Sequence, residues 1–386
     1  MDYIGMTKDD LKSRGGFFTG SEIAGQPQLW HKVSALIDSK QDEIQKFLAH
    51  SLVDAKKIIL TGAGTSAYIG LSLQGVFQRK LKTCTDAVAT TDLVSHPQDY
   101  FSGDTTVLLV SFARSGNSPE SIAAVKLADK FSQKCYHLIV TCDKDGALAK
   151  FETKSPHFVL LLPPESNDKG LAMTGSYTSM LLAGMLIARI QELDIVQPQI
   201  AIICKYGEKV INEYSDALQK IAETNFNRGV FLGSGPFFGT ATESHLKLQE
   251  LTDGMIICKN ETFLGFRHGP KAVVNEHTMI EYIFSNEKYV MKYEKDLVKA
   301  MTKGRKPMVE FAISEIEIPG LKLDLFIQLS NNGKQVDEEL LSICYVIPGQ
   351  LIGFFKSLHM GFKPDAPSKS GSIARVVEGV NIYDML

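Results

Sequence analysis

Short apolar runs alternate with helix-length stretches from residue 56 onward, and this alternation limits the possible folds more than any other feature of the chain. It is typical of parallel strands joined by helices that cover both faces of a sheet. The pattern therefore predicts an α/β fold, in which a helix-rich stretch from Tyr177 to about Ala222 closes the first unit. The predicted strands are Lys57–Thr61, Thr83–Ala89, Thr106–Ser111, Tyr136–Thr141 and Phe158–Leu162.

The same order of elements starts again at residue 228. Arg228–Gly235 resembles Lys57–Gly64 in order and residue type, and further apolar runs follow at 254–258, 278–284 and 325–329. A repeat of about 170 residues is too long for a solenoid, and 386 residues exceed what one core usually serves. We therefore predict a helical segment over 1–52 and two similar domains over 53–222 and 223–386.

Two loops rich in Ser and Thr follow predicted strands of the first domain, at Leu60–Ala67 and Ser111–Ser118. A loop between a parallel strand and a helix offers free backbone N–H groups and the positive end of the helix dipole. Hydroxyl groups would add further donors to an oxyanion, and the residues that carry them are Thr65, Ser66, Ser115 and Ser118. Two such loops side by side predict a phosphate pocket that needs neither Lys nor Mg²⁺, which suits a sugar monophosphate.

The second domain lacks the second of these loops. Where the first domain has Ser111–Ser118, the second has Ser285–Tyr289, with neither the glycine nor the cluster of hydroxyls. The sequence therefore predicts one phosphate site per chain and leaves the second domain free to supply other groups.

The segment Gly62–Ala67 also matches the dinucleotide-binding pattern G-x-G-x-x-A, with Asp92 at roughly the expected distance. The hydroxyls of Thr65 and Ser66 crowd the turn where a pyrophosphate needs bare backbone. The second Ser-rich loop also follows the third strand, where a dinucleotide fold has no phosphate to bind. A dinucleotide-dependent dehydrogenase is therefore the weaker interpretation.

Three residues of the second domain are candidates for acid–base or covalent chemistry. Glu250 falls on the apolar face of a predicted helix, which suits either a structural ion pair or proton transfer. His268 lies in a loop that ends in Gly-Pro, where a histidine is either structural or a positioned acid–base group. Lys369 lies in an irregular segment near the C-terminus, and an imine-forming lysine would need burial beside a cation.

Bulk properties exclude several classes of function. The net charge of −3 and the lack of a basic stripe give no support for nucleic-acid binding. The six cysteines form no CxxC pair, and no His or Cys cluster has the spacing of metal ligands. No apolar run approaches the roughly 20 residues of a membrane span, and the N-terminus lacks the apolar core of a signal peptide. We therefore expect a cytoplasmic protein with no metal, cofactor, nucleic acid or membrane partner.

Taken together, these motifs resemble the SIS (sugar isomerase) family in its tandem-domain form. The resemblance covers about residues 50–380 and rests on GAGTS at 62–66, SFARSGNSPES at 111–121, LKLQEL at 246–251 and GFRHGP at 265–270. With SLHMG at 357–361, it is strongest to the AgaS type, described as galactosamine-6-phosphate deaminase/isomerase or tagatose-6-phosphate ketose/aldose isomerase. It implies two flavodoxin-like three-layer domains.

The resemblance also implies roles for individual residues. Glu250 would move a proton between C1 and C2 of the sugar, His268 would assist ring opening, and Lys369 matches an imine-forming lysine. Arg114 would face the sugar. The predicted substrate and phosphate ligands are Gly64, Thr65, Ser66, Arg114, Ser115, Gly116, Asn117 and Ser118.

The activity implied is conversion of an amino-hexose 6-phosphate, D-galactosamine 6-phosphate, to D-tagatose 6-phosphate and ammonia without a cofactor. A ketose/aldose 6-phosphate isomerase that does not deaminate, a glucosamine-6-phosphate deaminase and a non-catalytic sugar-phosphate regulator stay open as alternatives. In related enzymes the histidine loop reaches into the neighbouring subunit's site, so the resemblance also implies a homodimer.

Overall fold

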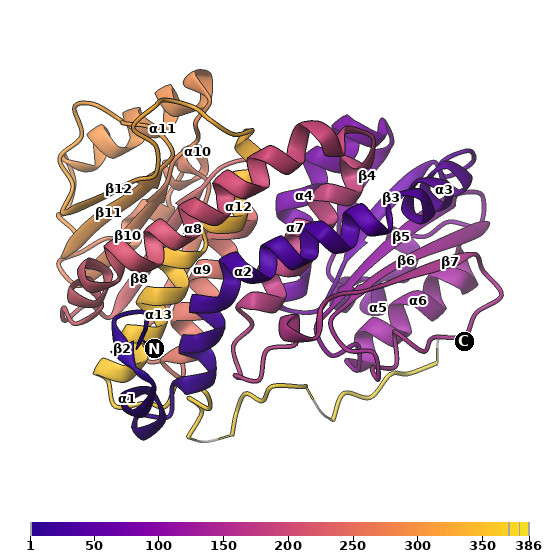
Figure 1. The fold of residues 1–386 in the computed structure, drawn as a ribbon, viewed down its shortest axis with the longest axis horizontal. Coiled ribbons are helices and arrows are strands. Elements are labelled where there is room, and N and C mark those ends of the chain that lie inside the picture. Colours follow the sequence, from indigo (N-terminus) through magenta and orange to yellow (C-terminus); the bar gives the residue numbers. More distant parts are fainter. Residues whose placement is uncertain (1, 370, 378, 385–386) are drawn as a thin grey trace. The chain divides into compact units, whose positions relative to one another are not determined.

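The structure is a computed structural model that describes residues 2–369, 371–377 and 379–384. It divides into two compact units, each built on a five-stranded parallel sheet (Figure 1). The first-sheet unit takes its described residues from 28–168, 175–198 and 374–386, and the second-sheet unit from 1–27, 169–174 and 199–373. Each unit is therefore made of segments that are distant in the sequence.

The first sheet has the strand order β4-β3-β5-β6-β7, and all neighbouring strands are parallel. This is the flavodoxin-like order 2-1-3-4-5, whose switch point lies between the first and third strands, here β3 and β5. The elements of this part of the chain are α3 (Gln41–Ser51), β3 (Lys57–Thr61), α4 (Thr65–Leu81), β4 (Cys84–Ala87), α5 (Thr90–Ser95), β5 (Thr106–Ala113), α6 (Pro119–Phe131), β6 (Lys134–Thr141), β7 (His157–Leu161) and α7 (Gly175–Ala188).

Helices cover both faces of the first sheet. On one face, α5 and α6 pack on a cluster that includes Ile59 and Leu109, whose side chains point to the same side. On the other face, α4 packs against α7, in which every residue is buried. A Cβ at Gly184 would lie 2.3 Å from Leu73 Cδ1, so the close approach of α7 to α4 requires glycine there.

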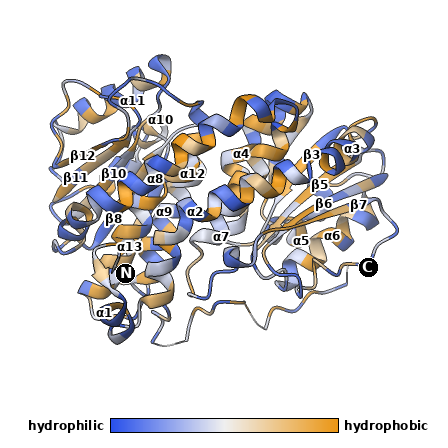
Figure 2. Cartoon of the chain, viewed as in Figure 1, coloured by the Kyte–Doolittle hydropathy of each residue, from blue (hydrophilic) through white to orange (hydrophobic). Residues whose placement is uncertain are grey.

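The second sheet has the order β12-β11-β10-β8-β9, which is again 2-1-3-4-5 when read from its first strand, β8. Figure 2 shows that the inner strands of the sheets, such as β5 and β10, carry mostly hydrophobic residues, as strands buried on both faces require. The elements are β8 (Arg228–Gly233), α9 (Phe237–Leu251), β9 (Ile257–Glu261), α10 (Phe263–Phe266), β10 (Thr278–Ile283), α11 (Lys288–Met301), β11 (Val309–Ser314), β12 (Leu325–Gln328), α12 (Glu338–Cys344) and α13 (Ile347–His359).

The remaining elements precede or join the sheets. Two long helices pass from one unit into the other along the chain, since the unit boundaries at Pro27 and Pro198 fall inside them. The elements are β1 (Asp2–Tyr3), β2 (Met6–Thr7), α1 (Lys8–Ser13), α2 (Phe17–Ser39), α8 (Leu193–Ala222) and the short 3₁₀ turns η1 (Pro97–Asp99), η2 (Pro164–Ser166), η3 (Ile190–Glu192) and η4 (Pro270–Val273).

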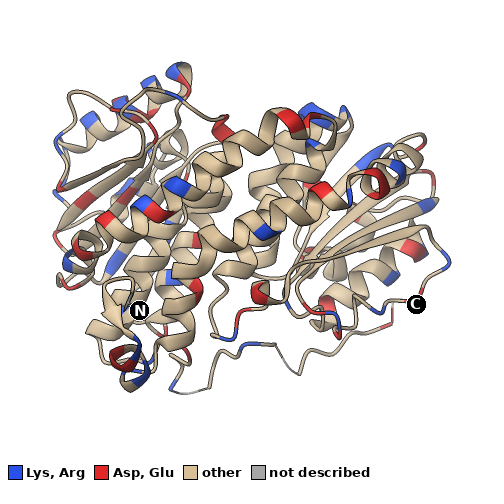
Figure 3. Ribbon diagram, in the orientation of Figure 1, with Lys and Arg blue, Asp and Glu red and all other residues tan. Residues whose placement is uncertain are grey.

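Helices α12 and α13 are largely buried in the second-sheet unit. The stretch Glu338–His359 is 22 residues long and apolar enough to cross a membrane by composition, a run that the sequence analysis overlooked. All of its apolar window is buried inside the protein, so it also fits the core helices of a folded unit. Figure 3 shows that the charged residues of both signs are dispersed over the outer helices and loops.

The predicted α/β class with two parallel sheets is confirmed, and β3 has the predicted bounds. The strand β11 was not predicted, and the run predicted at 254–258 is largely a turn that precedes β9. The ranges 1–52, 53–222 and 223–386 stay a prediction, while the units of the structure interleave in sequence. In particular, the described part of the C-terminal segment from Ala374 packs with the first-sheet unit.

Several carboxyl groups are buried in the second-sheet unit, and Glu294 of α11 is one of them. Its side chain is buried, and its Oε2 accepts a hydrogen bond from the Ser285 backbone N–H at 2.9 Å. Burial raises the pKa of Glu294 to about 8, and the nearby carboxyl of Glu338 contributes in the same direction. The hydrogen bond from Ser285 opposes this shift.

The raised pKa of Glu294 predicts a pH-dependent stability. The native state keeps this proton up to about pH 8 and the unfolded state loses it near pH 4.5, so the native state is destabilised as the pH rises between these values. Replacing Glu294 with Gln removes this effect, and the free energy of unfolding of the variant should gain up to about 1.4 kcal/mol per pH unit over the wild type. Urea unfolding from pH 5 to 8 measures it.

The matched control is Glu276→Gln, which changes an exposed carboxylate of the same unit. A difference between Glu294→Gln and wild type that stays constant across this pH range would contradict the prediction.

Candidate functional site

The two predicted phosphate loops lie at the switch point of the first sheet. Strands β3 and β5 are paired in parallel with Thr61 opposite Ser111, so their following loops leave the same edge of the sheet side by side. Each loop contains a glycine with positive φ, Gly64 at 55° and Gly116 at 66°. The helices that follow, α4 and α6, both begin without a hydrogen bond from an N-cap side chain. No N-cap side chain therefore competes with an anion at the first turn of either helix.

The hydroxyl groups of these loops differ in their surroundings. Thr65 and Ser66 are buried in the first turn of α4, whereas Ser118 is half-buried at the N-cap of α6. Ser115 is buried, and its Oγ accepts a hydrogen bond from the Asn117 backbone N–H at 3.3 Å. The Asn117 side-chain oxygen accepts a hydrogen bond from the Ala147 N–H at 2.9 Å, which links this loop to the segment after β6. The structure thus brings the predicted residues of both loops to one edge.

Arg114 connects the second loop to the C-terminal segment. It is buried at the end of β5, and its guanidinium donates a hydrogen bond to the Arg375 carbonyl. Arg375 in turn donates to the Asp168 carbonyl at 2.9 Å and to Asn167 Oδ1 at 2.7 Å. The Asp168 carboxylate accepts hydrogen bonds from the first backbone N–H groups of α7, at Gly175 and Ser176.

Hydrogen bonds to Arg114 and to the Asn167–Asp168 segment therefore hold the C-terminal segment beside the second phosphate loop. The sequence analysis did not single out Arg375, because no local motif surrounds it. Only the fold brings residue 375 next to residues 114 and 168.

Glu250 lies at the end of α9 beside a buried cation. Lys247 is fully buried, and its Nζ lies 2.6 Å from Glu250 Oε2 and 3.2 Å from Glu243 Oε1. Glu243 is also fully buried, whereas the Glu250 side chain is 23% exposed. These residues follow the i, i+3 and i, i+4 spacings of one helix face. One oxygen of Glu250 is thus fixed by an ion pair while its carboxylate reaches the surface of the unit.

The electrostatics of this face follow from burial and charge. Burial alone would lower the pKa of Lys247, but the carboxylates of Glu243 and Glu250 outweigh it and raise the pKa above its ordinary value. Helix α13 packs closely against this turn of α9, since a Cβ at Gly353 would lie 3.0 Å from the Lys247 carbonyl oxygen. The lysine is therefore a buried charged group on a helix that is itself packed against α13. The sequence analysis selected Glu250 and missed Lys247 and Glu243, although their spacing on the helix was available as a signal.

His268 and Lys369 are both exposed in the second-sheet unit. His268 follows α10, and its backbone N–H donates to the Gly265 carbonyl at 3.0 Å. The Lys369 ammonium lies 4.8 Å from the centre of the Phe362 ring, and its backbone N–H donates to Asp253 Oδ2 at 3.3 Å. The burial that an imine-forming lysine requires is not found at Lys369. Its catalytic role and that of His268 stay predictions.

The corresponding loop of the second sheet is occupied by internal hydrogen bonds. After β10, Ser285 Oγ donates to Glu338, and Asn286 Nδ2 donates to Glu315 Oε2 at 2.6 Å. Glu294 also accepts from the Ser285 N–H. Carboxyl groups of the same unit thus take donors of this loop that a phosphate would need.

One group of side chains in the described residues has the composition of a metal site, namely Asp129, Cys135 and His137. His137 Nε2 lies 2.7 Å from Asp129 Oδ1, whereas Cys135 Sγ lies 3.9 Å from His137 Nδ1. The two partners face opposite ring nitrogens, so this arrangement does not converge on one ion. The group lies near the start of β6, at the opposite end of the strands from the phosphate loops.

Comparison with known proteins places this site in a family. The SIS domain model matches residues 51–190, which include both phosphate loops. A curated relative from Shewanella sp. (strain ANA-3), D-galactosamine-6-phosphate deaminase AgaS, is 36% identical over 98% of this chain and 95% of its own length. The chain belongs to the SIS domain family, in its AgaS group.

Solved structures agree over the whole chain. A crystal structure from Clostridium novyi NT is 40% identical and covers 100% of both chains with a TM-score of 0.97. The tagatose-6-phosphate ketose/aldose isomerase from Escherichia coli is 32% identical, with a TM-score of 0.87 over 96% of this chain and 98% of that one. The family match therefore includes both sheets, although the domain model matches only the first.

The buried ions of α9 predict a large and specific loss of stability. Lys247→Met would leave the Glu243 carboxylate buried without its cation, which costs about 3–5 kcal/mol of unfolding free energy. The double variant Glu243→Leu/Lys247→Met removes the stranded charge as well and should recover most of that loss. Urea unfolding measures both.

The control is Lys259→Met, which breaks the half-exposed ion pair with Glu261 and should cost less than about 1 kcal/mol. If Lys247→Met costs no more than Lys259→Met, the pairing on α9 does not stabilise the unit.

Proposed function

We propose that the protein is an aldose–ketose isomerising deaminase that converts D-galactosamine 6-phosphate and water to D-tagatose 6-phosphate and ammonia. The observation that carries a sugar-phosphate substrate is the pair of uncapped helix N-termini at the β3–β5 switch point, with hydroxyls in both loops. The name of the Shewanella relative supports the amino sugar. The name of the Escherichia coli isomerase supports the ketose product.

The phosphate is held by the loops at Gly64–Ser66 and Ser115–Ser118, where backbone N–H groups and hydroxyls supply donors. Arg114 is directed to the Arg375 carbonyl, so it orders the C-terminal segment beside the substrate. Its effect on the sugar is therefore indirect in this proposal. The phosphate oxygens carry the negative charge that two helix dipoles favour.

Glu250 is the base in this mechanism. In the open-chain amino aldose it removes the proton from C2 and returns one to C1, which moves the double bond and gives a C2 imine. Water adds to that imine, and ammonia leaves as the C2 ketone forms. The carboxylate needs one fixed oxygen and access to the substrate, and the Lys247 ion pair with a partly exposed side chain supports this.

His268 assists ring opening as a proton donor and acceptor, which its exposed loop permits. Lys369 is retained as a candidate for contact with the C1–C2 region, without an imine, because it is exposed.

We further propose a cytoplasmic homodimer. The exposure of the His268 loop on its own unit supports a role in a neighbouring subunit's site. All six cysteines are free thiols, which supports a reducing compartment.

An assay of ammonia release separates the candidate functions. The purified protein is tested with the 6-phosphates of galactosamine, glucosamine and their N-acetyl forms, and ketose formation from galactose 6-phosphate is followed in parallel. Ammonia from galactosamine 6-phosphate supports the proposal. Isomerisation without ammonia would establish the plain isomerase, ammonia from glucosamine 6-phosphate alone the other deaminase, and binding without turnover a regulator.

Replacing Glu250 with Gln preserves its shape and removes the base. The value of kcat should fall by roughly 10² to 10⁴, the usual contribution of general base catalysis, while substrate binding is largely kept. Steady-state ammonia release and an independent binding measurement give the two numbers. The matched control is Glu223→Gln, an exposed carboxylate at the end of α8, which should leave kcat unchanged. Near-normal turnover of Glu250→Gln would exclude this residue as the base.

Replacing Ser115 and Ser118 together with Ala tests the phosphate loops. Each lost hydrogen bond to a charged group contributes on the order of 1.5–3 kcal/mol, so KM for the phosphorylated sugar should rise roughly a hundredfold or more. The kcat/KM for the non-phosphorylated sugar should hardly change. The control Ser95→Ala, at the end of α5, should leave kcat/KM for both sugars unchanged. Equal losses of kcat/KM on the two sugars would mean that the loop is only structural.

A further inference from the structure

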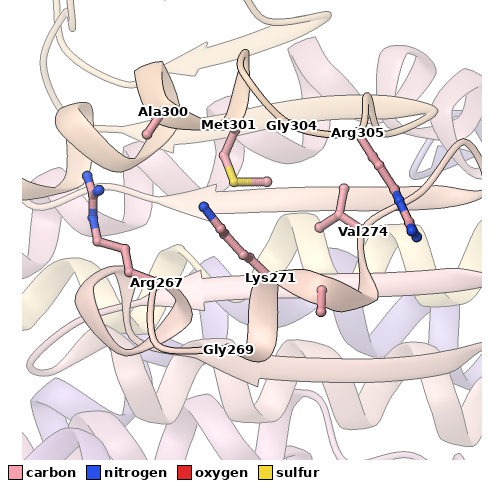
Figure 4. Close-up of a pocket in the computed structure, with 9 residues that line it drawn as sticks. Arg267, Gly269, Lys271, Val274, Ala300, Met301, Gly304 and Arg305 are labelled. Atoms are coloured by element: carbon pink, nitrogen blue, oxygen red, sulfur yellow. The ribbon is translucent and has the colours of Figure 1, made fainter.

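A pocket lies in the second-sheet unit. Its volume is about 320 Å³, and it is bounded by the segment that carries η4 and by the end of α11 with the turn that follows. Figure 4 shows Arg267 and Arg305 at opposite ends of this pocket, with Lys271 and Met301 between them. It shares no residue with the loops at 64–66 and 115–118.

The charged residues that line this pocket are all positive. Three of its nine lining residues are the cations Arg267, Lys271 and Arg305, and none of the lining residues is acidic. All three are exposed, and none forms an ion pair among the described residues. Three like charges around one small cavity raise its positive potential, and a bound anion would lower that energy.

The floor of the pocket is apolar. Val274 and Met301 are buried there, and Ala272 and Ala300 complete the lining. A volume near 320 Å³ is at the lower end of the range of small-molecule sites, which is larger than a bare phosphate needs. The apolar surface would contact the organic part of a ligand while the cations bind its charged group.

We infer that this pocket binds a phosphate monoester of a small organic molecule, as an anion site built from other residues than the phosphate loops. A phosphate monoester is a dianion near neutral pH and therefore matches three cations better than a single carboxylate does. Two of the cations, Arg267 and Lys271, flank His268 in the sequence. A bound ester that bridges them would restrain the His268 loop and thereby change the rate of turnover. That effect on turnover rests on the proposed function, whereas binding of the ester does not.

The test is calorimetric titration of the full chain with glucose 6-phosphate, inorganic phosphate and glucose. The Ser115→Ala/Ser118→Ala variant serves as the background, because its weakened substrate site leaves this pocket to be measured. We expect glucose 6-phosphate to bind this variant, with inorganic phosphate weaker and glucose undetectable. Adding Lys271→Gln and Arg305→Gln should weaken glucose 6-phosphate binding at least tenfold, since two charge-assisted contacts are lost.

The matched control carries Lys303→Gln and Lys306→Gln, which remove two exposed charges from the same turn without lining the pocket. An equal loss of affinity in the control would overturn the proposal, because net charge would then explain the binding. Equal affinity for inorganic phosphate and glucose 6-phosphate would also overturn it, because the apolar floor would contribute nothing. Neither result depends on ammonia release, so a failure of this site is distinguishable from a failure of the proposed activity.

Discussion

The parallel pairing of β3 with β5 is the constraint on which the candidate substrate site depends. Because the two strands are neighbours and run in the same direction, their loops emerge at one edge. The helices that follow must then cover opposite faces, α4 against α7 and α6 against α5. Two helix N-termini consequently lie at the same edge of the sheet, and their dipoles favour an anion there.

This topology is necessary for a phosphate site but does not produce one by itself. The second sheet has the same strand order, yet the loop after β10 binds its own buried carboxylates through Ser285 and Asn286. Those carboxylates take up the donors and would repel a phosphate. The two halves of the chain therefore share a strand order, but in the second sheet carboxyl groups of the chain itself bind the loop at the switch point through Ser285 and Asn286.

The sequence predicted the features that depend on local pattern. The strand Lys57–Thr61, the Ser-rich loops and the placement of Glu250 on a helix could all be read from apolar periodicity and turn residues. The strand β11 was missed although Gly304 and Pro307 mark a turn before it, because Val309–Ser314 is a short run interrupted by a glutamate. The contacts of Arg375 could not be predicted, since they join residues more than 200 positions apart.

The buried ion pairs of α9 hold the Glu250 carboxylate in position, which apolar side chains could not do. Apolar side chains of similar size would hold the helices together at least as well, because burying charges costs as much as their attraction returns. They could not, however, hold a carboxylate oxygen in one position. Lys247, buried and anchored by Glu243, gives Glu250 a fixed orientation at the surface of its unit, so the pairing contributes geometry rather than stability beyond that of an apolar core.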